Sequence, residues 1–388
     1  MIDVVVVGGG PVGLAAAIAA RLHGLSVRLV DRQRPPIDKA CGEGLMPAGV
    51  RALAALGVPL PLRSLPFRGI RYLSDGVVAE ADFPGVPGRG IRRTELHGAL
   101  VRRAEEVGVE LVWGTRVESA GVGCVRTAAA IWPCRFVVGA DGLRSPLRRA
   151  LGLGAGEVPP ARGDAAGPPG WSSRARFGVS RHLQLAPWSE RVEVTFGTAA
   201  EAYVTPLAAD EIGVAILWSG GKGGFDELLA TRFPPALAAR LAGAAVAGRD
   251  HGAGPLRQPA RGAVAGGGRI ALVGDAAGYV DALTGEGLSL GFEAALALGE
   301  SLAAGDLTAY ARRLARLAAL PNGLTHLLLV AARRPWLRRR LVRALAADSL
   351  LFGNFLGLLG DRRPLRQLRV GRTLRLCSRL AWPATVAG

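Results

Sequence analysis

Residues 2–13, Ile2-Asp-Val-Val-Val-Val-Gly-Gly-Gly-Pro-Val-Gly13, decide the fold of this 388-residue chain. Four consecutive valines before the glycines are typical of a buried parallel strand. The glycines follow that strand, and residues 11–23 have the pattern of a helix. Residues 26–30 form a second predicted strand, which ends at Asp31. The segment therefore predicts a compact strand–helix–strand unit.

The spacing of the glycines fits a turn that binds a dinucleotide. Gly8 permits the tight turn, Gly10 lets the backbone approach a pyrophosphate, and Gly13 lets the helix pack against the strand. The phosphates would then meet the free N–H groups and the positive dipole end of the helix. Asp31 stands where a carboxylate can accept hydrogen bonds from a ribose hydroxyl. This turn alone does not separate FAD from NAD.

The rest of the chain leaves this nucleotide-binding domain and later returns to it. A Pro/Gly-rich stretch at 153–170 precedes residues 173–218, which have the pattern of antiparallel strands. Residues 269–273 return to a buried strand. The expected domains are a nucleotide-binding domain (1–60, 90–160 and 262–305), a substrate-binding α+β domain (61–89 and 170–261) and a basic helical C-terminal region (306–388).

The chain is strongly basic, with a formal net charge of +17. Between Arg333 and Arg379 there are 13 arginines against Asp348 and Asp361, a net charge of +11. These arginines stand among leucines and not in a polar arm with interleaved aromatics, so we expect no nucleic-acid partner. Peripheral contact with an anionic membrane or a partner is one reading, and a solvated helical face packed on its own domain is the other. No obligate protein partner is evident.

The cysteines point to a reduced, cytoplasmic setting. The four cysteines form no CxxC pair and no metal-ligand spacing with the five histidines, so no metal site is expected. No basic segment precedes the first apolar run, which argues against a signal peptide. No run of 18 uncharged apolar residues occurs, so we expect no transmembrane helix, although the protein could associate with a membrane.

Two further motifs carry a resemblance to a known family. Residues 137–148, Val-Val-Gly-Ala-Asp-Gly-Leu-Arg-Ser-Pro-Leu-Arg, resemble the DG motif of group A (p-hydroxybenzoate hydroxylase-like) flavoprotein oxidoreductases. Residues 271–278, Ala-Leu-Val-Gly-Asp-Ala-Ala-Gly, resemble their GD motif. The resemblance implies an α/β fold: a Rossmann-like FAD-binding domain with an inserted antiparallel-sheet substrate domain and a helical C-terminal region. It also implies FAD as cofactor. Because no second nucleotide-binding unit is visible, NAD(P)H would dock transiently, or an external donor would supply electrons.

Two segments resemble the geranylgeranyl reductase-like flavoproteins, namely Lys39-Ala-Cys-Gly-Glu-Gly-Leu-Met-Pro47 and Asp281-Ala-Leu-Thr-Gly-Glu-Gly287. Gly278 stands where aromatic hydroxylases usually carry a histidine, which favours the reductase-like branch. The same sequence also resembles flavin hydroxylases associated with lipid-tailed polyketide phenols and quinones. The halogenase signature of two tryptophans around Ile-Pro is absent, since Trp171 and Trp188 are isolated.

The resemblance implies a set of cofactor contacts. Arg93 matches the family arginine that reaches the pyrophosphate, although an ordinary surface arginine is the alternative. Backbone N–H groups near Gly285 and Gly287 would stabilise the anionic reduced flavin. The full predicted cofactor set is Gly8, Gly10, Pro11, Val12, Gly13, Asp31, Arg32, Cys41, Gly42, Arg93, Val117, Asp141, Gly142, Gly274, Asp275, Ala276, Gly285, Glu286 and Gly287.

A flavin performs the redox chemistry, so few catalytic side chains are needed. Glu43 could relay a proton, or it could be a structural carboxylate that binds backbone N–H groups. Cys41 is the other catalytic candidate, but no paired base is visible, and a small packing residue is the alternative. Tyr203 and Trp218 could line a substrate pocket, or could be aromatic core residues.

Three functions follow as hypotheses. The first is an NAD(P)H-linked monooxygenase that hydroxylates a lipophilic phenolic or polyketide-type molecule. The second is a flavin ene reductase of polyprenyl C=C bonds. The third, of another class, is a non-catalytic flavin-binding protein associated with a membrane. The apolar bias of the chain favours a lipophilic substrate. An enzyme that binds only NAD is a weaker possibility.

Overall fold

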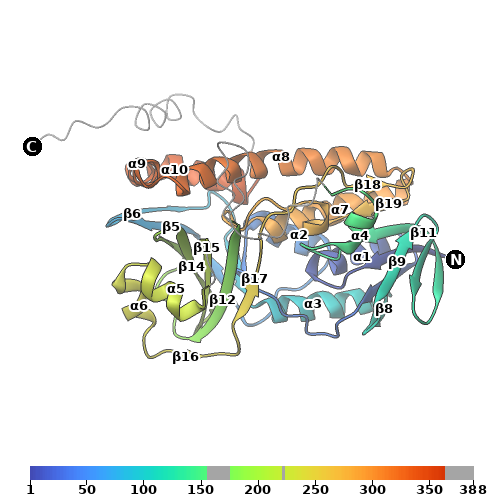
Figure 1. The fold of residues 1–388 in the computed structure, drawn as a ribbon, viewed down its shortest axis with the longest axis horizontal. Helices are drawn as coiled ribbons and strands as arrows, with labels where there is room; N and C mark the ends of the chain where they lie inside the picture. Colours follow the sequence, from blue (N-terminus) through green and yellow to red (C-terminus); the bar gives the residue numbers. More distant parts are fainter. Residues whose placement is uncertain (155–174, 221–222, 363–388) are drawn as a thin grey trace, which may run out of the picture.

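The computed structural model describes residues 1–154, 175–220 and 223–362. Within them the chain builds two large sheets with a helical layer along one side (Figure 1). Parts of the predicted domains, residues 155–174 with Trp171 and residues 363–388, lie outside the described residues. The predicted fold class is confirmed, and the domain boundaries stay predictions.

The first sheet is built on the strand of four valines. Its parallel strands are β1 (Ile2–Val7), β2 (Val27–Asp31), β8 (Glu110–Trp113), β11 (Ile131–Gly139) and β19 (Ile270–Leu272). Antiparallel β18 (Val264–Ala265) closes one edge, and β9 (Val117–Gly121) and β10 (Cys124–Thr127) extend β11. Val4 and Val6 pack into one core and Val5 and Val7 into another, so both faces of β1 are buried.

Helices cover one face of this first sheet. Side chains of α1 (Pro11–Leu22), α3 (Arg93–Glu106) and α7 (Gly287–Ala304) form one core with it. The opposite face packs against β10 and α4 (Pro146–Ala150). A 3-10 helix (Gly274–Ala277) follows β19, so the Gly-Asp motif stands at the carboxyl end of a central strand, where α/β folds bind ligands.

The second sheet runs in the order β16-β12-β15-β14-β13-β5-β6, with β17 also on β12. The predicted antiparallel pattern holds except between β13 and β5, which are parallel. Helices α5 (Phe225–Arg232) and α6 (Pro235–Leu241) cover one face. The strands are β5 (Gly69–Ser74), β6 (Val77–Asp82), β12 (Arg176–Gln184), β13 (Arg191–Phe196), β14 (Ala200–Ala208), β15 (Glu211–Ser219), β16 (Ala245–Val246) and β17 (His251–Ala253).

A small third sheet is formed within residues 44–91, between β2 and β8 of the first sheet in the chain. Its strands β3 (Gly44–Leu45), β7 (Gly88–Ile91) and β4 (Ser64–Phe67) pair in that order, and α2 (Pro47–Ala55) follows β3. Strand β3 begins directly after the predicted Cys-Gly-Glu segment, so this sheet fixes where that segment leaves the first domain.

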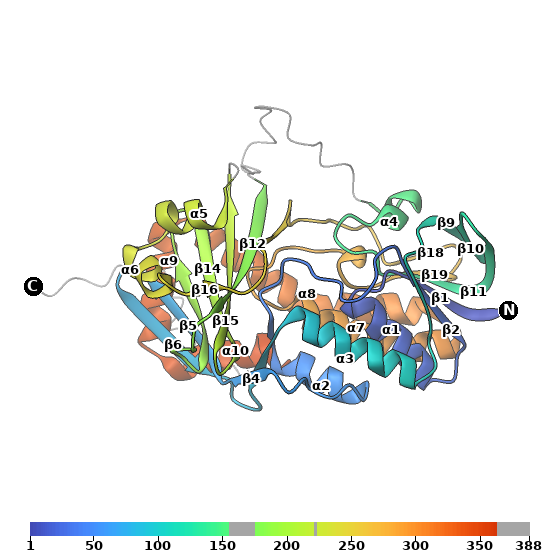
Figure 2. The ribbon, with the colours of Figure 1, turned by 90° about the horizontal axis from the view of Figure 1, so that it is seen from below.

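The helical layer consists of α8 (Leu307–Ala332), α9 (Pro335–Ala346) and α10 (Ser349–Gly360), and the three helices together run along one side of the molecule (Figures 1 and 2). The buried Tyr310 hydroxyl donates to the Leu272 carbonyl at 2.7 Å, which fixes α8 to the first sheet. By length and composition alone α8 could also cross a membrane, which does not overturn the expectation of no transmembrane helix, and that expectation stays a prediction.

Candidate functional site

The glycine-rich turn leaves open space at the start of α1. A Cβ on Gly13 would lie 1.9 Å from the Gly8 carbonyl oxygen, so helix and strand approach this closely only without a side chain there. A Cβ on Gly10 would meet no atom within 4 Å. Asp31 fixes the turn, because its Oδ2 accepts the Gly9 N–H at 2.7 Å. The close approach of helix and strand agrees with the packing role predicted for Gly13, and the contact of Gly10 with a pyrophosphate stays a prediction.

Basic groups stand around this open space. The Nε of Arg93 is buried and has no hydrogen-bond partner in the described part of the chain. Burial raises the pKa of Asp275, and the charges of Arg93 and Lys39 oppose that shift. An unpaired guanidinium donor beside a helix N-terminus suits an anionic ligand. These residues fit the pyrophosphate and ribityl chain of FAD.

The DG motif forms a capped turn. The Asp141 carboxylate accepts the Ser145 hydroxyl and, at 3.0 Å, the Leu147 N–H. Gly142 has φ 80°, a conformation that suits glycine. Asp141 thus holds the start of α4, and the cofactor contacts predicted for Asp141 and Gly142 stay predictions.

Gln258, which sequence reasoning missed, joins the DG and GD turns. Its Nε2 donates to the Asp275 carbonyl at 2.6 Å and to the Gly142 carbonyl at 3.3 Å, and the side chain is buried. Nearby, a Cβ on Gly274 would lie 3.0 Å from Val12 Cγ1, so the turn packs on α1. A single glutamine in a loop has no sequence signature, so only the fold could identify it.

The other predicted cofactor residues lie at element ends. The Thr115 N–H donates to the Asp31 carbonyl at 3.0 Å, which brings the chain just before Val117 beside the end of β2. Arg32 is exposed next to Asp31, Pro11 is the first residue of α1, and Ala276 is fully buried. The structure does not test their predicted contacts with the cofactor.

Glu286 precedes α7, and Gly287 begins it. Gly285 has φ 66°, so the turn before the helix needs a glycine there. The Glu286 carboxylate lies 2.6 Å from Arg362 Nη1. Any contact of this segment with a flavin would therefore come from its backbone and not from the Glu286 side chain.

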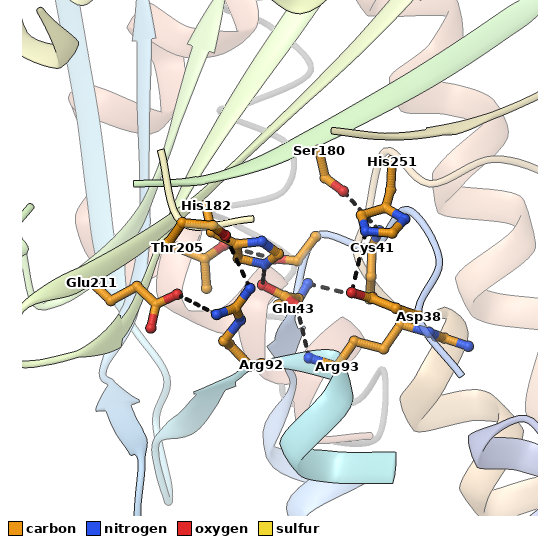
Figure 3. A network of polar contacts seen from close by, with 12 residues as sticks. Asp38, Cys41, Glu43, Arg92, Arg93, Ser180, His182, Thr205, Glu211 and His251 are labelled. Atoms are coloured by element: carbon orange, nitrogen blue, oxygen red, sulfur yellow. Dashed lines mark hydrogen bonds and ion pairs between the residues drawn. The ribbon is translucent and has the colours of Figure 1, made fainter. Parts of the chain in front are cut away.

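Glu43 lies at the centre of a buried polar network (Figure 3). It is 5% exposed and has φ 56°, which is unusual for a residue other than glycine. Its Oε1 accepts the Arg93 N–H at 2.7 Å, and its Oε2 lies 2.6 Å from His182 Nε2 on β12. The structure shows the backbone bond that the structural alternative requires, and a proton relay stays a prediction. His182 was not predicted.

Further bonds connect the segment around Glu43 to the second sheet (Figure 3). Asp38 Oδ2 lies 3.2 Å from His251 Nε2 on β17, and the Thr205 hydroxyl of β14 donates to the Gly42 carbonyl at 2.8 Å. Burial raises the pKa of the Cys41 thiol. A protonated thiol is a poor nucleophile, which supports a packing role for Cys41.

A second buried polar group connects the loop before α7 to the same sheet. Arg176 Nη2 on β12 lies 2.7 Å from Glu201, and its Nε lies 2.9 Å from Asp281. The Tyr203 hydroxyl donates to the Leu283 carbonyl at 2.9 Å. Because Asp281 and Leu283 follow the GD motif, these bonds hold the sheet against the cofactor-binding side of the first domain.

Tyr203 lines an apolar pocket between the second sheet and the helical layer. Trp218 does not: it packs with Phe225 and Leu228 on the face covered by α5 and α6. The core alternative stated for these aromatics therefore fits Trp218, and a substrate contact of Tyr203 stays a prediction. Side chains along a strand alternate between faces, and the sequence did not show which face was which. The pocket is lined by Tyr72, Val194, Phe196, Tyr203, Leu283, Leu328, Ala331, Ala332, Arg338, Leu341 and Val342.

Comparison with known proteins adds independent findings. A family model described as FAD binding domain matches residues 1–161. A menaquinone reductase of Mycolicibacterium smegmatis is 30% identical over 345 residues, 79% of this chain and 78% of that protein. The FAD-dependent monooxygenase OpS4 of Beauveria bassiana is 32% identical over 222 residues, 52% of this chain and 51% of that protein. The halogenase PltM, solved with phloroglucinol and FAD, has the same fold, with a TM-score of 0.72 at 17% identity over 97% of this chain and 85% of that one.

Proposed function

Because this chain belongs to the FAD binding domain family of FAD-dependent oxidoreductases, we propose that it reduces a lipid-tailed quinone or a related polyprenyl compound. The observation that carries the proposal is the apolar lining beside Tyr203, around a narrow cavity of about 20 Å³ that would widen to admit a substrate. The similarity to a menaquinone reductase, which covers more than three quarters of each chain, supports it. We include the geranylgeranyl reductase-like assignment in this proposal, on the two segments that resemble that branch.

Bound FAD would supply hydride chemistry, and the chain would hold it through residues of the first domain. The start of α1 at Gly10 would meet the pyrophosphate, and Asp31 the ribose. Arg93 would add a charge-assisted hydrogen bond to the phosphates. Among the described residues a second strand–helix–strand nucleotide site is absent, so NAD(P)H would dock transiently or an external donor would supply the electrons.

The pocket would orient the substrate. The aromatic side chains of Tyr72, Phe196 and Tyr203 line it on the side of the second sheet, and Leu328 and Ala331 of α8 line it on the other side. The Tyr203 hydroxyl donates to the Leu283 carbonyl, which fixes the ring. Glu43 and His182 would hold a proton between Oε2 and Nε2 at the edge of the second sheet.

Hydroxylation of a lipophilic phenol is the second candidate. The similarity to the monooxygenase OpS4 favours it, although that similarity covers about half of each chain. Both candidates need the same pocket and differ in whether oxygen is consumed.

Product analysis separates the candidates. Purified protein is reduced anaerobically with NADPH or NADH, with and without polyprenyl quinones and lipid-tailed phenols, and the products are analysed by mass spectrometry. A gain of two hydrogens supports the reductase, and an oxygen-dependent gain of one oxygen atom supports the hydroxylase. If neither donor bleaches the flavin with any substrate, the non-catalytic alternative is favoured.

A pair of variants tests the pocket. Ala332→Phe places a ring in the lining, whereas Ala315→Phe changes an exposed position of the same helix. We expect Ala332→Phe to raise KM for long-tailed substrates about tenfold with flavin content unchanged, and Ala315→Phe to behave like the parent protein. Equal kinetics for the two variants would count against this pocket as the substrate site.

A further inference from the structure

The junction of α8 and α9 exposes large apolar side chains. Leu327 is 66% exposed, Val330 44% and Trp336 54%. Leu327 and Val330 are three residues apart and therefore share one face of α8. Trp336 follows at the start of α9. We call these three residues the apolar corner, and clustering of this kind marks contact surfaces more often than solvent-facing ones.

Basic residues precede and follow the apolar corner along α8 and α9. Between Leu307 and Ala347 the chain has nine arginines and no aspartate or glutamate. Arg333 and Arg334 lie between the two helices and are exposed, and the guanidinium of Arg340 stacks over the Trp336 ring with 5.4 Å to its centroid. The exposed arginines of this stretch are Arg312, Arg313, Arg316, Arg333, Arg334, Arg339 and Arg343.

The same turns of helix line the proposed substrate pocket on their inner side. Leu328 and Ala331, which alternate with Leu327 and Val330 along α8, belong to the pocket lining. Figures 1 and 2 show α8 and α9 as an outer layer on the molecule. One thin wall therefore separates the pocket from the apolar corner.

We propose that the apolar corner and its flanking arginines dock on an anionic lipid surface, from which the pocket receives its apolar substrate. Tryptophan and arginine beside leucine and valine suit the boundary between headgroups and acyl chains. Delivery of the substrate from the membrane rests on the proposed function, whereas docking on the membrane does not. The opposite face of α8 is held in the protein by Tyr310 and Leu329, so the helix lies on the membrane and does not cross it.

Vesicle binding by the FAD-loaded protein tests the docking. Co-sedimentation is measured with vesicles of phosphatidylcholine alone and with vesicles that also contain phosphatidylglycerol. We expect binding to the anionic vesicles that weakens as salt is added. The triple variant Leu327→Gln, Val330→Gln, Trp336→Gln and the double variant Arg333→Gln, Arg334→Gln should each weaken binding about tenfold.

Matched controls change the same residue types elsewhere. Leu62→Gln with Val122→Gln replaces exposed apolar residues, and Arg126→Gln with Arg149→Gln replaces exposed arginines. Both controls should bind vesicles like the parent protein, and flavin absorbance reports correct folding in every variant.

The docking would be overturned if the protein does not bind anionic vesicles, or if the control variants lose as much vesicle binding as the corner and arginine variants. It would also be overturned if the corner and arginine variants lose self-association or RNA binding while their vesicle binding is unchanged. Turnover of detergent-dispersed substrate without vesicle binding would refute only the docking. Vesicle binding without turnover of any lipid substrate would refute only the proposed function.

Discussion

Single residues in the glycine-rich turn separate packing from ligand binding. Gly13 faces the Gly8 carbonyl, and Gly10 faces open space with φ −69°, a backbone angle that alanine adopts without strain. The chemistry of this turn could be read from the sequence because each glycine has a fixed role at a fixed spacing. The roles of His182 and Gln258 could not be read from the sequence, because these residues reach their partners only through the pairing of distant strands and loops.

The two glycines predict different alanine phenotypes. Gly10→Ala should leave the stability of the cofactor-free protein within about 0.5 kcal/mol and weaken FAD binding at least about tenfold. Gly13→Ala should also lower the free energy of unfolding by about 2 kcal/mol or more, because its Cβ collides with backbone. Urea unfolding and FAD titration measure both effects. Identical behaviour of the two variants would contradict this division of roles.

Glu43 predicts a graded response to substitution. Glu43→Ala removes the carboxylate and leaves the buried Arg93 N–H and His182 Nε2 without this partner, so the free energy of unfolding should fall by about 2–4 kcal/mol. Glu43→Gln retains an acceptor for the Arg93 N–H and should lose about half as much.

Glu106→Ala is the control for this series. It removes an exposed pair with Arg103 and should cost less than about 1 kcal/mol. Chemical denaturation of the four proteins gives the ranking, and a Glu43→Ala variant no less stable than Glu106→Ala would refute the structural role.

At the scale of elements, buried bonds connect pieces that the sequence presents separately. Tyr310 joins α8 to β19, and Glu286 joins the start of α7 to Arg362 just after α10. Helices and strands were predictable from apolar periodicity, but the face that each presents was not. Trp218 illustrates this: its strand was predicted, and its side chain points to α5 instead of the pocket.

Glu286 predicts a pH dependence of stability. Burial raises its pKa to about 7, and Arg362 opposes the shift. The folded chain therefore holds a proton more tightly than the unfolded chain, so this group's contribution to stability is lost as pH rises from about 4.5 to about 7. Glu286→Gln has no such titrating group. Its free energy of unfolding should therefore rise relative to that of the parent by up to about 3 kcal/mol as the pH increases from about 4.5 to about 7.

Glu300→Gln, at an exposed position of the same helix, is the matched control. Denaturant unfolding at several pH values compares the three proteins. A stability difference between Glu286→Gln and the parent that does not change with pH would contradict the expectation.

At the scale of the molecule, the cofactor site is assembled from segments far apart in the chain. The turns at Gly10, Gly142 and Gly274 come from the beginning of the chain, from the end of β11 and from the chain after the second sheet. The order of these motifs could be read from the sequence. The bonds from Glu43 and Arg176 that hold the second sheet to these motifs could not be read from the sequence, because they depend on three-dimensional contact.

This assembly predicts that FAD stabilises the whole protein. FAD at about 100 times its Kd should add about 2.7 kcal/mol to the free energy of unfolding. The thermal midpoint should rise in a single transition, because the bound ligand bridges all three turns. Differential scanning calorimetry in a titration with FAD measures the shift, and ADP serves as a smaller control ligand. A shift confined to one of two separate transitions would contradict the expectation.

The return of the chain to its first sheet also constrains synthesis on the ribosome. Strand β19 pairs with β11, and α7 packs on α1, yet both emerge more than a hundred residues after their partners. Until then the nascent chain holds β11 with an open edge and α1 with an uncovered apolar face, features that invite aggregation. Synthesis of the first domain thus begins before that of the second domain and ends after it. We therefore expect chaperones to bind the early translation products of this protein.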